Sequence, residues 1–305
     1  MCSKQTLAIN EWFKDINQYR ETDDKSLLIS QLPKKWQRHG DIILFPNTAF
    51  CHEWWSEVTS AQWTDLARRL KVRRLGLMGK TLCNDFRQPT VRLLLGTDGW
   101  TEHVDNHVRY SFDVTKTMFS SGNITEKMRV AKFDCSEEVV ADLYAGIGYY
   151  TLPYLVHAGA SHVHACEWNP DAVEALKAGL RKNNVVGRCT VHSGDNSLAP
   201  IEGVADRVNL GLLPSSKPGW KVACAALKPC GGYLHIHDCL NTKAMSKQEA
   251  ERCYSEETVT SITDLLRSVK PHDDWNVKAM HLEKVKSYAP HITHVVLDVR
   301  CAPIT

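Results

Sequence analysis

The chain has 305 residues, enough for one large domain or two moderate ones that each bury a hydrophobic core. Its composition, 43% hydrophobic and 24% charged, is typical of soluble globular proteins. No stretch of 18 apolar residues occurs, which excludes a membrane-spanning helix. The net charge of +2 neither indicates nor excludes a nucleic-acid partner. Whether the protein binds nucleic acid therefore depends on whether its positive charges cluster. The first residues hold no apolar signal-peptide core, and we expect a cytoplasmic protein.

The eleven cysteines are scattered from Cys2 to Cys301 without a Cys-x-x-Cys pair. This pattern is typical of free thiols in a reducing compartment, not of disulfides or a zinc site. The chain also has two His-x-His pairs, His162/His164 and His235/His237. Each pair falls on an expected strand and has no acidic or cysteine partner at ligand spacing, so we predict no metal site.

Residues 1–25 are polar and weakly patterned, and we expect a tail or a lone helix there. Mixed signals follow: an apolar strand at 42–45, helical spacing of apolar residues between 55 and 70, and short strands within 72–79, 90–96 and 107–114. We therefore predict a small α+β module over residues 26–118, suited to positioning RNA or substrate.

From about residue 130 strands and helices alternate regularly. The expected strands lie within 135–146, 161–168, 188–196, 205–214, 231–240 and 293–301. Helices are expected at 150–159, at 169–184 and near 219–227, the second capped by Asn169 with Pro170 at its first position. Such alternation predicts an α/β fold with a doubly wound, Rossmann-like parallel sheet over residues 119–305.

Ligands of such sheets bind at the carboxyl ends of the strands, and polar or glycine residues follow four of these strands. They are Asp142 with Gly146 and Gly148, then Glu167, then Asp195 with Asn196, and finally Asn209. Each feature alone has an ordinary structural explanation: a tight turn, a charge at a helix N-terminus or a polar turn. Their order on successive strands favours a nucleotide-like ligand.

The glycine turn distinguishes two cofactors. A nicotinamide site usually has a third glycine, which lets a helix N-terminus hold the pyrophosphate, but Thr151 occupies that position. S-adenosylmethionine carries no phosphate and needs a turn beside its methionine part, an acid for the ribose and a polar residue near the adenine. Asp142 with the two glycines, Glu167, and Asp195 with Asn196 supply these in order, so we favour S-adenosylmethionine over NAD.

A basic cluster in the predicted module suits a phosphate backbone, although a solvated face is an equal alternative. Its members are Arg68, Arg69, Lys71, Arg73, Arg74 and Lys80, with Lys34, Lys35 and Arg38 nearby. Trp36, Trp54 and Trp55 could stack on bases, but tryptophans in a small module more often belong to its core.

Four stretches together resemble a known family: FSSGNITEKMRVA (119–131), DLYAGIGYYTLP (142–153), ACEWNPDAVEALKAGLRKNN (165–184) and NLGLLPSS (209–216). They resemble the wybutosine-synthesis aminocarboxypropyltransferases that act on phenylalanine tRNA, relatives of the tRNA guanine-37 N1-methyltransferases. The resemblance runs from about residue 32 to the end. Its assignment to the transferase branch rests on GIGYYTLP and NLGLLPSS.

The resemblance implies transfer of the 3-amino-3-carboxypropyl group of S-adenosylmethionine, not its methyl group, to 4-demethylwyosine beside the anticodon. Methylthioadenosine would leave. It also implies roles for residues outside the strand ends: Ser120 and Lys127 would contact the cofactor, and Arg129 would contact RNA or substrate. Asn209 would face the acceptor base. No general base stands out in the sequence.

Relatives often carry a further N-terminal domain that grips tRNA, whereas only a short leader precedes the module here. We expect a monomer with no metal and no membrane partner. Three alternatives stay open at this point: a tRNA guanine-37 N1-methyltransferase on the same fold, a non-catalytic RNA-binding protein, and a dehydrogenase.

Overall fold

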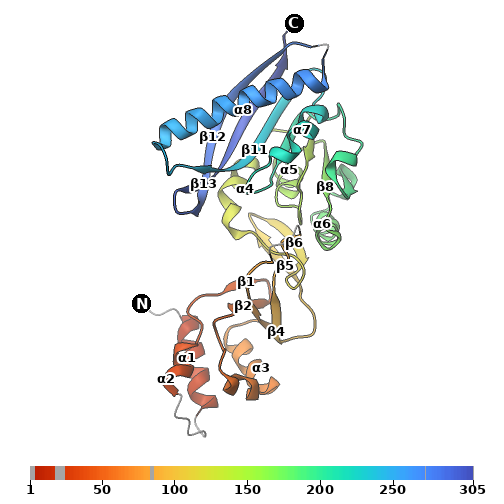
Figure 1. Cartoon of the computed structure of the whole chain (residues 1–305). Coiled ribbons are helices and arrows are strands. Elements are labelled where there is room, and N and C mark those ends of the chain that lie inside the picture. Colours follow the sequence, from red (N-terminus) through yellow and green to blue (C-terminus); the bar gives the residue numbers. More distant parts are fainter. Residues whose placement is uncertain (1–3, 18–24, 83–85, 272, 305) are drawn as a thin grey trace. The chain divides into compact units, whose positions relative to one another are not determined.

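The computed structural model describes residues 4–17, 25–82, 86–271 and 273–304. The chain forms two compact units, coloured along the sequence in Figure 1. The first runs to Val104 and takes in Ser111–Phe119, and the second comprises Asp105–Tyr110 and the chain from Ser120 onward. None of the helices in the described ranges is long and apolar enough to cross a membrane.

The first unit is built on a four-stranded sheet of order β1-β2-β3-β4, in which only β2 and β3 run parallel. Its elements are α1 (Lys4–Ile16), α2 (Lys25–Ser30), β1 (Gln37–His39), β2 (Ile42–Pro46), η1 (Glu53–Glu57), α3 (Ser60–Arg69), β3 (Arg74–Met78) and β4 (Val91–Leu95). A two-stranded sheet of β5 (Trp100–Asp105) and β6 (Val108–Asp113) follows.

Residues 4–16 were expected as part of a tail or a lone helix, but α1 packs into the core of the first unit. Ile9, Trp12 and Phe13 lie on one helical face and are buried. The Trp12 ring stacks on Trp63 at 5.3 Å. Trp55 is 4% exposed in the same core, so the packing alternative is confirmed for that tryptophan.

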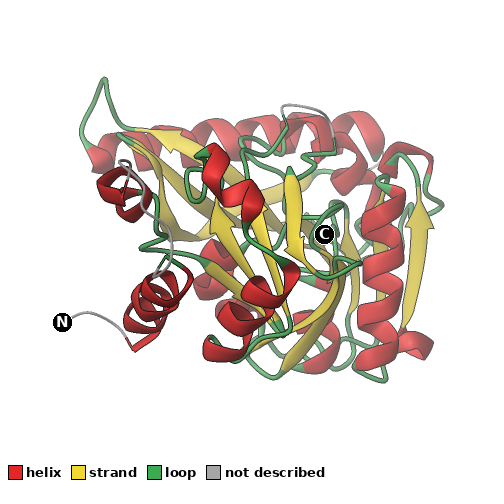
Figure 2. Ribbon diagram, turned by 90° about the horizontal axis from the view of Figure 1, so that it is seen from below, coloured by secondary structure: helices red, strands yellow, loops and turns green. Residues whose placement is uncertain are grey.

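The second unit holds a seven-stranded sheet of order β12-β13-β11-β10-β7-β8-β9. Its elements are η2 (Ser121–Asn123), α4 (Ile124–Val130), β7 (Val139–Asp142), α5 (Thr151–Val156), β8 (His162–Glu167), α6 (Pro170–Lys182), η3 (Val186–Arg188), β9 (Cys189–Ser193), η4 (Asn196–Leu198), β10 (Arg207–Leu210), η5 (Lys217–Gly219), α7 (Trp220–Ala226), β11 (Gly232–Asn241), α8 (Lys247–Val269), β12 (Trp275–Ala289) and β13 (Ile292–Pro303). Figure 2 shows the helices and strands of the chain in a second view.

The five strands from β9 to β11 run parallel, which confirms the Rossmann-like fold. The other edge differs from a wholly parallel sheet, because β13 is antiparallel to β11 and β12 is antiparallel to β13. Neither α8 nor β12 was expected from the sequence.

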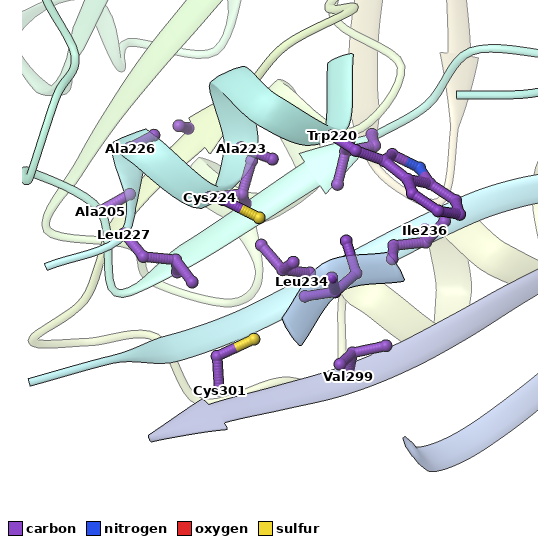
Figure 3. Close-up of a cluster of buried hydrophobic side chains, with 14 of the residues drawn as sticks. Ala205, Trp220, Ala223, Cys224, Ala226, Leu227, Leu234, Ile236, Val299 and Cys301 are labelled. Carbon is purple, nitrogen blue, oxygen red and sulfur yellow. The ribbon is translucent and has the colours of Figure 1, made fainter. Parts of the chain in front are cut away.

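The two faces of this sheet differ in chemistry. One face packs against α7 and α8, where Trp220 and Cys224 meet Leu234 and Val299 in an apolar cluster (Figure 3). Because side chains alternate along a strand, the neighbouring residues point to the opposite face. That face carries a polar row of register partners that crosses four strands: Asp142, Asn209, His235 and Asp298.

Candidate active site

The turn after β7 requires its two glycines. Gly146 has φ +56° and Gly148 has φ +97°, which are backbone conformations that favour glycine. A Cβ at Gly148 would also lie 2.9 Å from side-chain atoms of both Leu152 and Leu176. The turn therefore brings the start of α5 close to α6.

Asp142, expected as a cofactor contact, is fully buried at the end of β7. Its carboxylate accepts hydrogen bonds from Thr151 Oγ1 at 2.7 Å and from Asn209 Nδ2 at 2.9 Å. Burial raises the pKa of Asp142. The Asp142 carboxylate therefore orients both Thr151 and Asn209. Thr151, at the position of the missing third glycine, is one of the residues it holds.

Asn209 lies at the end of β10 and is fully buried, with its Oδ1 atom lacking a hydrogen-bond partner. Tyr150 is 3% exposed, and its hydroxyl also lacks a partner. The Tyr150 ring lies beside Gly211, where a Cβ would be 3.3 Å from it. Buried polar atoms are seldom left unpaired in folded proteins, so the two atoms indicate a site that a polar ligand or water completes.

Glu167 ends β8 and joins two elements of the site. Its Oε2 accepts from the Gly146 amide at 2.7 Å, and its Oε1 accepts from the Asn169 amide at 2.8 Å. Burial raises the pKa of Glu167, and these backbone hydrogen bonds oppose the rise. A carboxylate has about four acceptor positions, so further lone pairs remain for a ribose hydroxyl.

Asn196 joins the end of β9 to the same turn, since its Nδ2 donates to the Leu143 carbonyl at 3.0 Å. Asp195 is exposed and caps η4 through the Ser197 amide at 2.8 Å. The structure therefore brings Glu167 and Asn196 to the glycine turn. Two exposed apolar side chains were missed by the sequence reading: Trp168, 52% exposed, and Leu198, 83% exposed. Trp168 directly follows Glu167, and Leu198 follows Asn196 by two residues, so an apolar residue close to each polar strand end is the signal that could have found them.

Lys127, expected to contact the cofactor, lies on the buried side of α4. It is 2% exposed and forms an ion pair with Asp105, with its amino group 5.2 Å from the centre of the Tyr110 ring. Burial lowers the pKa of Lys127, and the Asp105 carboxylate opposes this. Helical spacing in α4 explains the position, because Lys127 and Val130 share its buried side. Ser120 is half-buried directly before η2 and makes no capping hydrogen bond there.

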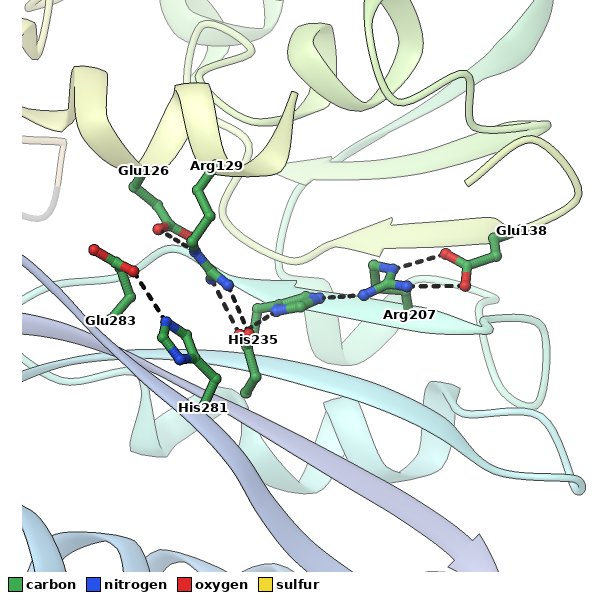
Figure 4. A network of polar contacts seen from close by, with 8 residues as sticks. Glu126, Arg129, Glu138, Arg207, His235, His281 and Glu283 are labelled. Carbon is green, nitrogen blue, oxygen red and sulfur yellow. Dashed lines mark hydrogen bonds and ion pairs between the residues drawn. The ribbon is translucent and has the colours of Figure 1, made fainter. Parts of the chain in front are cut away.

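Arg129, expected to contact RNA or substrate, is 16% exposed and bridges Glu126 and Asp298. A chain of polar contacts continues from Asp298 through His235 to Arg207 (Figure 4). Arg207 in turn pairs with Glu138 at 2.7 Å. The network occupies the polar face of the sheet under α4 and satisfies its charges internally, which explains why Arg129 is not a surface residue.

Glu126 is a functional candidate that the sequence reading missed. It is fully buried, and burial raises its pKa to about 7 against the opposing effect of Arg129. A carboxyl group with this pKa can take up or release a proton near neutral pH. Its i,i+3 spacing to Arg129 is visible in the sequence, but its burial is not.

Four arginines of the basic cluster in the first unit form ion pairs with acidic side chains. Arg74, expected to contact RNA, is 12% exposed and pairs with Asp41 at 2.5 Å and with Asp98 at 2.8 Å. Arg73 also bonds Asp41 but stays 83% exposed. Arg68 and Arg69 pair with acidic side chains as well.

Histidines of both His-x-His pairs contact other side chains of the protein. His164 contacts His192 at 3.1 Å, and His235 contacts Asp298 at 2.6 Å. Within the part of the chain that the structure describes, no three His, Cys, Asp or Glu residues are grouped to hold a metal ion.

Comparison with known proteins gives two family models that together cover most of the chain. The TRM5/TYW2 methyltransferase domain matches residues 101–262, and the TYW2 N-terminal domain matches residues 23–99. The tRNA wybutosine-synthesizing protein 2 homolog of Danio rerio is 48% identical over 297 residues, which cover 90% of this chain and 72% of that protein.

Two solved structures are similar over most of their length. P. horikoshii TYW2 in complex with MeSAdo has 28% identity and a TM-score of 0.71, covering 96% of this chain and 99% of that one. M. jannaschii TYW2 in complex with AdoMet has 25% identity and a TM-score of 0.63, covering 88% and 100%.

Proposed function

The chain belongs to the tRNA wybutosine-synthesizing protein 2 family, and we propose that it transfers the 3-amino-3-carboxypropyl group of S-adenosylmethionine to 4-demethylwyosine at position 37 of phenylalanine tRNA. The proposal rests on one observation: a chain of this family has a polar site at the carboxyl ends of its parallel strands. Glu167 and Asn196 meet the glycine turn there, and Asn209 adds an unpaired acceptor. The products are the modified tRNA, methylthioadenosine and a proton.

The residues fit S-adenosylmethionine. Glu167 would hold the ribose hydroxyls with its remaining acceptor positions, and Gly146 and Gly148 let the turn take a backbone path that other residues disfavour. Exposed Trp168 and Leu198, directly after β8 and within η4, offer apolar surface to an adenine. When bound, the cofactor supplies a sulfonium that activates its attached carbons toward a nucleophile. Ser120 remains a proposed contact, while Asp142 would act through Asn209 and Thr151.

The acceptor side would use Asn209 and Glu126. The unpaired Asn209 oxygen can accept a hydrogen bond from the acceptor base, and its orientation is fixed by Asp142. Alkylation of a ring carbon releases the proton that the carbon carried. Glu126, with its pKa of about 7, is suited to accept that proton, and Arg129 orients its carboxylate through two hydrogen bonds.

We propose that the module of residues 26–118 positions the anticodon region of the tRNA and that residues 119–305 carry catalysis. Arg73 would contact phosphate, because its guanidinium is mostly exposed. We further propose that the protein acts as a monomer in the cytoplasm, without a metal.

The test is to incubate the protein with S-adenosylmethionine labelled separately in its methyl and carboxyl groups. The tRNA is phenylalanine tRNA that carries 4-demethylwyosine, and the matched control carries unmodified guanine 37. We expect carboxyl label in the first RNA and none in the second. Methyl label in the guanine control would replace this proposal with a guanine-37 methyltransferase.

A further inference from the structure

A second row of register partners crosses the sheet of the second unit, next to the polar row and on the same face. It comprises Arg207 on β10, Tyr233 on β11, Arg300 on β13 and Lys278 on β12. On β10, β11 and β13 it lies two residues from the polar row, and residues two apart on a strand point to the same face. Three of the four side chains are cations, so we call this set the cationic row.

The exposure of the cationic row increases from the centre of the sheet to its edge. Arg207 is 9% exposed, Tyr233 is half-buried, and Arg300 and Lys278 are exposed. The charge of the buried arginine is compensated, because Arg207 pairs with Glu138 at 2.7 Å and its guanidinium lies 4.9 Å from the centre of the Tyr233 ring. The two outer cations differ from the inner one in being open to solvent, since β12 is the edge strand.

Arg300 and Lys278 lie directly opposite each other on the antiparallel strands β13 and β12. Side chains in such positions have Cβ atoms about 4.5–5.5 Å apart, and like charges there destabilise a sheet. Neither cation forms an ion pair with a carboxylate in the described ranges of the chain. Their repulsion is therefore not relieved by the protein, and an anion that contacts both side chains would relieve it.

The nearest carboxylates on this face of the sheet are engaged by other side chains. Asp298, two residues before Arg300 on β13, accepts from Arg129 at 2.6 Å. Glu283 on β12 contacts His281 at 3.0 Å (Figure 4). The two outer cations consequently keep their charge available to a ligand.

A phosphate group fits this pair of cations. The planar guanidinium of Arg300 can donate two parallel hydrogen bonds to phosphate oxygens, and the Lys278 ammonium adds a point charge. Tyr233 is the register partner of Arg300 on the other side and provides an aromatic ring, the kind of side chain on which RNA bases stack. Cations next to an aromatic ring favour a polynucleotide backbone over a free inorganic anion.

The cationic row lies close to the candidate active site. Asn209 is on the same face of the sheet, and its strand β10 is two strands away from β13, about 10 Å across the sheet. We propose that Arg300 and Lys278 bind the phosphate backbone of the tRNA whose base is modified at the strand ends; the identity of this RNA rests on the proposed function. The second unit would thus contribute its own RNA contact, separate from the one proposed for Arg73.

The experiment measures binding of phenylalanine tRNA to the whole chain by filter binding over a series of salt concentrations. Arg300→Gln and Lys278→Gln each remove one exposed cation. We expect each of them to weaken tRNA binding about threefold or more and to reduce the slope of log affinity against log salt concentration by about one. The matched control is Lys221→Gln, which removes an exposed cation from α7 on the opposite face of the sheet and should change neither quantity.

A thermal scan of the free protein separates a ligand contact from a structural role. Loss of either cation should leave the thermal midpoint unchanged or slightly higher, because the repulsion between the two register partners is relieved. A structural role would instead lower the thermal midpoint and the tRNA affinity together, and would overturn the proposal.

Three binding results would also overturn it. Unchanged affinity and salt slope in both variants would show that the outer cations contact no phosphate of the tRNA. An equal loss in Lys221→Gln would show an effect of net charge alone. Lost binding of inorganic phosphate or of polyglutamate, with tRNA binding intact, would identify a small anion or an acidic protein as the ligand. Failure of the proposed function is seen separately, as absence of carboxyl label in a tRNA that still binds.

Discussion

Asn209 Nδ2 donates to the Asp142 carboxylate at 2.9 Å across two adjacent parallel strands, and this bond decides which atom of the amide is left unpaired. Because Asp142 can only accept when ionised, the Asn209 nitrogen must face it and the oxygen must face away. The buried Asp142 carboxylate thereby sets the polarity of the site.

We therefore expect Asp142→Asn to destabilise the second unit and to weaken catalysis together. The new amide cannot accept from both Thr151 and Asn209, so about 1–3 kcal/mol of unfolding free energy should be lost. Urea unfolding measures it. Asp195→Asn, at an exposed cap, is the control and should change stability by less than about 1 kcal/mol.

Glu167→Ala should weaken S-adenosylmethionine binding by about 1–3 kcal/mol, because both the ribose contact and the bond that fixes the Gly146 amide are removed. Calorimetry measures the affinity. Glu174→Ala, on the exposed side of α6, should leave it unchanged. Equal affinities in all three proteins would show that the acid does not hold the ribose.

Arg73→Glu and Arg74→Glu should have different effects. The first reverses an exposed charge, so it should weaken tRNA binding. It should also reduce the slope of log affinity against log salt concentration by about one or two. The second breaks two partly buried ion pairs and should lower the thermal midpoint of the first unit instead. A filter-binding salt series and a thermal scan of both variants separate the roles; tRNA affinity unaffected by Arg73→Glu contradicts the phosphate contact.

If Glu126 accepts the reaction proton, turnover under saturating substrate should rise as pH increases through about 7, since only the ionised carboxylate can act. Glu126→Gln should lower the rate about 100-fold or more and abolish that rise. Glu283→Gln, a nearby carboxyl on β12, should keep the same pH profile. A rising limb that survives in Glu126→Gln belongs to another group.

Stability should fall as pH drops from about 6.5 to about 4. The pKa of His294 is lowered to about 4 in the fold, so the unfolded chain binds a proton on this residue first. A group with a lowered folded pKa contributes stability above its unfolded pKa and loses it below. His294→Gln should flatten this part of a urea-midpoint series against pH, whereas exposed His281→Gln should not.

The parallel strands and the strand-end residues were predictable because both follow from local patterns. Glycine spacing, an acid after a strand and the Asn169 cap can each be read along the chain. The helix α8 and the strand β12 were not predictable from the sequence, because α8 buries few residues for its length and β12 is mostly an exposed edge strand. Their apolar periodicity is correspondingly weak.

The expected roles of Lys127, Arg129 and Arg74 could not be tested from sequence, because their partners lie far away in the chain. Asp298 is 169 residues from Arg129, and Asp105 is 22 residues from Lys127. A charged residue in a motif looks the same whether it contacts a ligand or a buried carboxylate. The partner of such a residue is decided by tertiary contacts, and residue type and spacing do not show them.

The hydrogen bonds between Glu167 and Gly146 and between Asn196 and Leu143 join residues of the protein and need no ligand. The ends of β7, β8 and β9 are therefore assembled before any ligand arrives, and little conformational entropy is left to be lost there on binding. The nucleoside part should consequently contribute nearly the same affinity to S-adenosylmethionine and to the product methylthioadenosine. Hydrogen exchange of the backbone amides in this turn should be slow in both the free and the bound protein.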